Sequence, residues 1–147
     1  MKIPLQVYDF ANGLRIMASL LIKAETLHIF AFVQAIVDTG SPETILGMSD
    51  MKKFRISKIQ INKLESRKKP IAYGGGQVKT KVLQDTKLKL GNFECVMPIQ
   101  IPSDEITPCS QPTILGVDFL IKNNLILFFD PNKKEAYFES SDFVPGT

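Results

Sequence analysis

The sequence predicts a single domain that consists mainly of β-strands. Apolar or alternating runs of strand length follow one another along the chain, and turn signals rich in Gly, Asn, Pro and Asp separate them. The length of 147 residues fits one domain, and a hydrophobic fraction of 44% supplies enough apolar side chains for one core. Residues 117–123 predict one short helix near the C-terminal side.

The N-terminal part is predicted to contain a hairpin and a long strand. Asn12-Gly13 is a typical hairpin turn, and residues 14–22 form the returning strand. Residues 26–37 are rich in apolar and β-branched side chains, which is expected of a strand that is buried on both faces.

A short strand, a helix and a basic segment follow. Residues 44–46 predict the strand, and Ser49 is placed to cap a brief helix over residues 50–54. Residues 52–69 contain eight Lys or Arg and one acid, Glu65. This composition favours a solvated face or loop, and the alternative is attraction of acidic peptides or another polyanion.

The second half is predicted to consist of hairpins, one short strand and the helix. In order, these are a hairpin over residues 71–83, a hairpin over 88–99, a loop over 102–112, a strand over 113–115, the helix over 117–123 and a hairpin over 125–138. The single domain spans residues 1–147, with the polar residues 139–147 expected to be a tail.

Composition excludes several classes of function. The longest apolar run is shorter than the roughly 18 residues of a membrane span, and no signal-peptide pattern is present, so we expect a cytoplasmic protein without membrane contact. The net charge of +3 gives no strong argument for nucleic acid. Cys95, Cys109 and His28 lack the spacing of a zinc site, so we expect no metal and no cofactor. A Ser-His or Cys-His nucleophile is disfavoured because His28 lies inside an apolar run.

Asp38 is the candidate for chemistry. It directly follows the apolar residues 35–37, and burying an ionised carboxylate is costly unless hydrogen-bond donors surround it. Thr39 and Ser41 offer hydroxyl groups, and Gly40 lets a backbone amide approach closely. From these residues alone, the alternative that Asp38 only caps its own turn stays open.

Residues 35–41, Ala-Ile-Val-Asp-Thr-Gly-Ser, resemble the active-site motif of retropepsin-like aspartic proteases. The resemblance implies that Asp38 is the catalytic carboxylate and that Thr39 locks two active-site loops together across a dimer. It also implies that Gly40 supplies the close backbone approach and that the hydroxyl of Ser41 hydrogen-bonds the carboxylate.

Two further segments carry the same resemblance, in the family's order. Residues 113–120 are similar to the apolar-apolar-Gly element below the catalytic loop, where Gly116 passes close to the catalytic strand and Asp118 has a structural role at a helix start. Residues 71–76 are similar to the flap hairpin that closes over bound peptide. The flap residues implied to bind substrate are Tyr73, Gly74, Gly75 and Gly76.

The resemblance implies a closed β-barrel with one short helix near the C-terminal side and a flap hairpin. It also implies an aspartic endopeptidase that hydrolyses peptides with a water activated by two Asp38 residues. Because the chain contains one Asp-Thr-Gly, the second Asp38 would come from the other subunit of a homodimer. The alternatives are an inactive peptide-binding or dimerisation module on the same fold, the protease region of a retroelement polyprotein, and a polyanion-binding protein.

Overall fold

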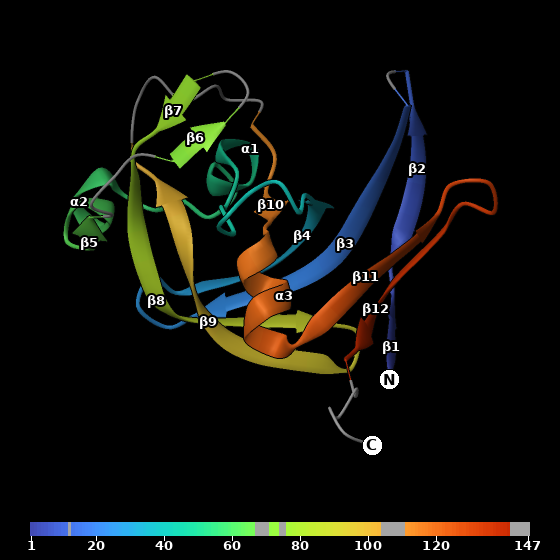
Figure 1. Cartoon of the computed structure of the whole chain (residues 1–147). Helices are drawn as coiled ribbons and strands as arrows, with labels where there is room; N and C mark the ends of the chain where they lie inside the picture. The colour runs from blue at the N-terminus through green and yellow to red at the C-terminus, as the bar shows by residue number, and fades with distance from the viewer. Residues whose placement is uncertain (12, 67–70, 74–75, 104–110, 142–147) are drawn as a thin grey trace.

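The structure is a computed structural model that describes residues 1–11, 13–66, 71–73, 76–103 and 111–141, with only the backbone for 71–73 and 76–78. Strands dominate this part of the chain (Figure 1). The strands are β1 (Lys2–Pro4), β2 (Gln6–Phe10), β3 (Gly13–Ala24), β4 (Ile29–Val37), β5 (Glu65–Ser66), β6 (Ile71–Tyr73), β7 (Gly76–Val78), β8 (Thr80–Leu90), β9 (Phe93–Pro102), β10 (Ile114–Leu115), β11 (Leu125–Asp130) and β12 (Glu135–Ser140). The helices are α1 (Met48–Met51), α2 (Lys58–Asn62) and α3 (Val117–Asn123).

The largest sheet has the strand order β10-β4-β3-β8-β5, with β2 paired to β3 and β9 paired to β8. Its hairpins follow the predicted turns. Phe10 pairs with Gly13, which has a φ of +116°, and Leu90 pairs with Phe93 around Gly91, which has a φ of +60°. Glycine adopts positive φ without the steric cost that a side chain would add, which suits both positions. Of the predicted Asn12-Gly13 turn, Asn12 lies outside the described residues and Gly13 is the first residue of β3.

A second sheet, β1-β12-β11, and helix α3 complete the core. Figure 1 shows α3 between this sheet and the long hairpin of β8 and β9. The ring of Phe119 on α3 is fully buried, with its centroid 6.0 Å from that of Phe93 and 5.7 Å from that of Phe138. Burial of one such side chain contributes roughly 1.5–3 kcal/mol, so Phe119 links both sheets through the helix.

Helix α3 has the predicted bounds. Gly116 is its N-cap, and Asn124 ends it in a left-handed conformation with a φ of +53°. Asn tolerates this conformation better than most residues, which explains the sharp end of the helix.

Within the described residues, the sheets do not close into the barrel that the resemblance implied. In this part of the chain, isolated bridges from Ile45, one to Gln100 on β9 and one to Ile114 on β10, span the gap between β9 and β10. The strand predicted over residues 44–46 is thus reduced to the bridges of Ile45, and a one-residue bridge cannot complete a strand ladder. The mainly β class is correct, whereas the closure is wrong.

Strand β4 differs from its prediction in length and in burial. It begins at Ile29 because residues 25–28 form a turn in which His28 has a φ of +52°. Its residues alternate between buried and exposed, and Phe30 and Phe32 are 67% and 74% exposed. Only one face of the strand packs on the core, so the expectation of burial on both faces is wrong.

Three other segments also differ from their predictions. Helix α1 begins after Gly47 and not after Ser49, and part of the basic segment forms α2, whose N-cap Ser57 accepts a hydrogen bond from the amide of Gln60. Glu139, placed in a tail by its sequence, pairs with Lys2 and so extends β12. None of the described helices is long and apolar enough to span a bilayer.

Candidate active site

Asp38 lies on an exposed loop directly after β4. The backbone around it is held by β10, which pairs in parallel with β4, and by hydrogen bonds from the amides of Ile36 to Thr113 O (2.9 Å) and of Asp38 to Leu115 O (3.1 Å). The amide of Gly40 donates to Oδ1 of Asp38 at 2.9 Å. The backbone at Asp38 is therefore fixed at the edge of the sheet, and the carboxylate at the end of its side chain is exposed to solvent.

Gly116 packs against the loop that carries Asp38. A Cβ atom built on Gly116 would lie 2.5 Å from the carbonyl oxygen of Glu43 and 2.9 Å from that of Ser41, distances that real Cβ atoms do not adopt. The next amide, of Val117, donates to Ser41 O at 2.9 Å. Because only glycine fits there, the start of α3 can lie directly on the loop and support it.

Thr44 and Asp118 form a second connection between the loop and α3. Oδ1 of Asp118 accepts a hydrogen bond from Oγ1 of Thr44 at 2.7 Å, and Oδ2 accepts from the amide of Thr44 at 2.9 Å. Oγ1 of Thr44 accepts in turn from the amide of Gly116 at 3.1 Å. Burial raises the pKa of the Asp118 carboxyl. Asp118 thus serves as a structural anchor at the helix start, as the resemblance implied.

The remaining motif residues lie on the same loop. Thr39 is exposed, which leaves its side chain open for contacts outside the subunit. Ser41 is buried, and its hydroxyl donates to the carbonyl oxygen of Glu43 at 2.8 Å, not to Asp38. The bond from Ser41 to the carboxylate that the resemblance implied is therefore absent from the single subunit. Ser41 instead stabilises the turn that follows Asp38.

Asp38 borders a hollow of about 450 Å³. Its other lining residues are largely apolar and come from β3, β4, β10 and β11: Leu14, Arg15, Ile16, Ile36, Val37, Ile114 and Phe129. Apolar walls beside one exposed carboxylate are a combination typical of a ligand-binding site.

The sequence did not reveal the contributions of Arg15 and Phe129 to this hollow. The pairing of Met17 with Ile36, continued for two residues, places Arg15 opposite Asp38, so the strand register was the signal that would have identified it. Phe129 lies far along the chain on β11, and no local pattern links it to Asp38.

The predicted flap is present as a hairpin of β6 and β7, with Tyr73 paired to Gly76. Figure 1 places it at the end of the molecule where α1 and α2 also lie. Gly74 and Gly75 lie outside the described residues, and Tyr73 and Gly76 are described by their backbone alone. The hairpin lies at the predicted position, and its role as a flap that binds substrate stays a prediction.

Comparison with protein-family models and with curated proteins gives no match. Solved structures do match. A retropepsin-like aspartic protease from Rickettsia conorii is similar with a TM-score of 0.59 and 15% identity, over 95% of this chain and 91% of the other. The EIAV protease, solved with the inhibitor HBY-793, is similar with a TM-score of 0.51 and 18% identity, over 74% of this chain and 86% of the other.

These similarities establish that the chain has the retropepsin-like fold. They extend over most of both chains. At such low identity the similarity concerns the fold, and the chemistry of this chain rests on its own residues.

Proposed function

We propose that this protein is an aspartic endopeptidase in which the Asp38 residues of two subunits together activate a water molecule. The observation that carries the proposal is the placement of Asp38. It is an exposed carboxylate at the carboxyl end of β4, fixed by the Gly40 amide, and its loop is supported by Gly116 within a retropepsin-like fold.

The chemistry needs two carboxylates that share one proton. One acts as general base on the water and the other, protonated, donates to the carbonyl oxygen of the scissile bond. Two like charges so close titrate as a pair, so one proton is retained where isolated carboxyls would both be ionised. One chain offers one Asp-Thr-Gly, and a two-fold axis beside the exposed Asp38 and Thr39 would supply the second carboxylate.

The substrate in this proposal is an extended peptide or protein segment. Its side chains would contact the apolar hollow beside Asp38, and the β6–β7 hairpin would cover it and offer main-chain hydrogen bonds. An inactive peptide-binding module on the same fold would use the same surfaces without cleavage, so a cleavage assay separates the two functions.

The test is incubation with a mixed peptide library from about pH 4 to about pH 7, a range that includes the acid side where a carboxylate dyad keeps one proton and the neutral side where it can lose it. We expect the wild type to cleave, Asp38→Asn to be inactive, and a statine-type transition-state mimic to block the reaction. Asp85→Asn is the matched control because it makes the same change at another exposed aspartate. Cleavage that persists in Asp38→Asn, or none by the wild type at high concentration, would refute the proposal.

A further inference from the structure

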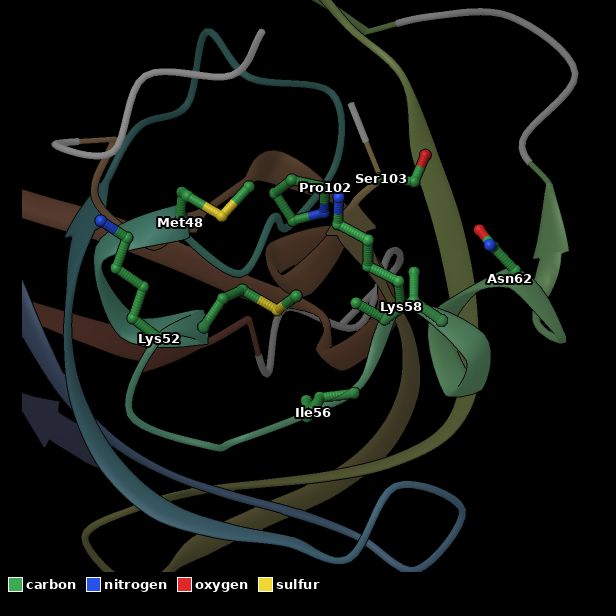
Figure 2. Close-up of a pocket in the computed structure, with 9 residues that line it drawn as sticks. Met48, Lys52, Ile56, Lys58, Asn62, Pro102 and Ser103 are labelled. Atoms are coloured by element: carbon green, nitrogen blue, oxygen red, sulfur yellow. The ribbon is translucent and has the colours of Figure 1, made fainter. Parts of the chain in front are cut away.

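A second hollow lies between α1, α2 and the end of β9, apart from the one beside Asp38. We call it the α1–α2 hollow and define it by five apolar residues: Met48, Met51, Ile56, Ile61 and Pro102. Its volume is about 310 Å³, and it shares no lining residue with the hollow that contains Asp38. Figure 2 shows Met48 and Pro102 along one side of the space and Ile56 along the opposite side.

Two lysines contribute to the lining of this apolar space. Lys52 and Lys58 line the hollow and lie on different sides of it in Figure 2. Residues 51–64 contain four Lys and one Arg and no Asp or Glu, and Asp50 and Glu65 flank this segment. Of these cations, Lys53 pairs with Asp50 at 3.1 Å, whereas Lys52 lines the hollow and is exposed. The site therefore favours a ligand that combines negative charge with an apolar group.

The volume of the hollow indicates the size of the ligand. Ile59, next to the lining residue Lys58 on α2, is 70% exposed and does not itself line the hollow. A volume near the lower end of the range of ligand pockets holds one large side chain, while the surface outside would contact neighbouring residues of the same segment. Methionine side chains adapt to different apolar shapes, and two of them, Met48 and Met51, line the space.

We propose that the α1–α2 hollow binds an acidic peptide segment, which inserts one apolar side chain against Met48, Met51 and Ile56 and places its carboxylates near Lys52. A nucleic acid would use the cations but not the apolar wall, and a lipid surface is flat where this site is concave. The site stands apart from Asp38, so binding does not depend on cleavage. If the proposed function holds, the hollow recruits acidic segments of the substrate at a distance from the scissile bond.

The experiment measures fluorescence anisotropy of a labelled peptide that has one central leucine between flanks of glutamate. The full chain with Asp38→Asn is used, so that cleavage cannot remove the peptide. We expect saturable binding that weakens as salt is added, because ions screen surface charges. Replacing the leucine of the peptide by serine, or its glutamates by glutamines, should each abolish binding.

Protein variants locate the site. Lys52→Glu should weaken binding about fivefold or more, the change expected for loss and reversal of one charge contact. Ile56→Asn should weaken it similarly, and the serine peptide tests the same contact if that variant does not fold. Lys133→Glu is the matched control because it makes the same charge change in the β11–β12 turn, on the other side of the molecule (Figure 1), and should leave binding unchanged.

Three results would overturn the proposal. The first is equal binding of the leucine and serine peptides, which would reduce the site to general charge attraction. The second is equal weakening by Lys52→Glu and Lys133→Glu. The third is binding of heparin or of phosphatidylserine vesicles that exceeds peptide binding and is lost in Lys52→Glu, which would assign the site to a polyanion or a membrane. None of these results bears on cleavage at Asp38, so failure here and failure of the proposed function remain distinct.

Discussion

Because Gly116 has no side chain, the start of α3 can pack directly against the loop that carries Asp38. The helix start lies so close to the Asp38 loop that the carbonyl of Glu43 occupies the space a Cβ would need. The amide of Val117 and the hydroxyl of Thr44 add hydrogen bonds across the same contact. The position of Asp38 thus depends on a close backbone contact as well as on its own hydrogen bond from Gly40.

Gly116→Ala is therefore expected to lower the free energy of unfolding by about 1–3 kcal/mol, the usual cost of forcing an extra methyl group into a packed site. The same change should reduce any cleavage activity more than the stability loss explains, because the loop that bears Asp38 must move. Urea denaturation and a cleavage assay measure the two effects. A variant within about 0.5 kcal/mol of the wild type would show that the backbone relaxes freely at Gly116.

Asp118 makes the stability of this anchor dependent on pH. Burial raises the pKa of its carboxyl above the ordinary value of 3.8, so the folded state retains a proton that the unfolded state has already released. The contribution of Asp118 to stability is then greatest below pH 3.8 and declines as pH rises through its raised pKa. Asp118→Asn has no proton to lose at this position.

We compare the unfolding free energy of the wild type with that of Asp118→Asn. The value for the wild type minus the value for the variant should decrease as pH rises from below 3.8 toward neutrality. Urea denaturation of both proteins across this range measures it, and the subtraction removes the other carboxyl groups, which titrate in both proteins. A difference that grows with pH would mean that the hydrogen bonds from Thr44 and Phe119, which favour the ionised form, outweigh burial.

Residues were predictable where a local motif marks them. Asp38 and Gly116 were found because their neighbours in sequence form a recognisable pattern. The hydrogen-bond partner of Asp118 could not be predicted from a local motif, because Thr44 lies 74 residues away in the sequence. Arg15 and Phe129 reach the hollow beside Asp38 through strand pairing, which single residues do not encode.

At the scale of elements, the sequence predicts the bounds of helix α3 well and the burial of strand β4 poorly. Helix α3 has Gly116 before it and Asn124 after it, and its bounds were predicted. Strand β4 is apolar at nearly every position, so its sequence gives no alternation and suggests burial on both faces. The fold buries one face and leaves Phe30 and Phe32 exposed, because the core lies on one side of the large sheet.

Two truncations of the same kind test this difference between elements. Phe119→Ala should destabilise the protein by about 3–5 kcal/mol, because its ring is fully buried between Phe93 and Phe138. Phe32→Ala should stay within about 0.5 kcal/mol of the wild type in the isolated chain, because Phe32 is 74% exposed. Thermal and urea denaturation of both variants measure the contrast. A large loss in Phe32→Ala would show that another layer covers β4.

At the scale of the whole molecule, the proposed function needs a second chain to complete the active site. Asp38 and Thr39 are exposed on the same loop, and Phe128 and Phe129 on β11 are each 39% exposed.

The order of the three segments along the chain was enough to predict the retropepsin-like class. The isolated bridges at Ile45, which replace a full strand, were not predictable from the sequence. Closure of the barrel depends on pairing between distant segments and not on any one segment.

Mixing subunits tests the dimer directly. If each active site needs an Asp38 from both chains, adding an equal amount of Asp38→Asn to the wild type at saturating concentration places about half of the wild-type chains in mixed dimers. These dimers hold one carboxylate and one amide, so cleavage should fall to about half. Adding Asp85→Asn chains instead should raise cleavage, since they supply intact Asp38. Activity unaffected by the Asp38→Asn chains, at concentrations where sedimentation shows that subunits exchange, would mean that one chain cleaves alone and that the two-subunit site is wrong.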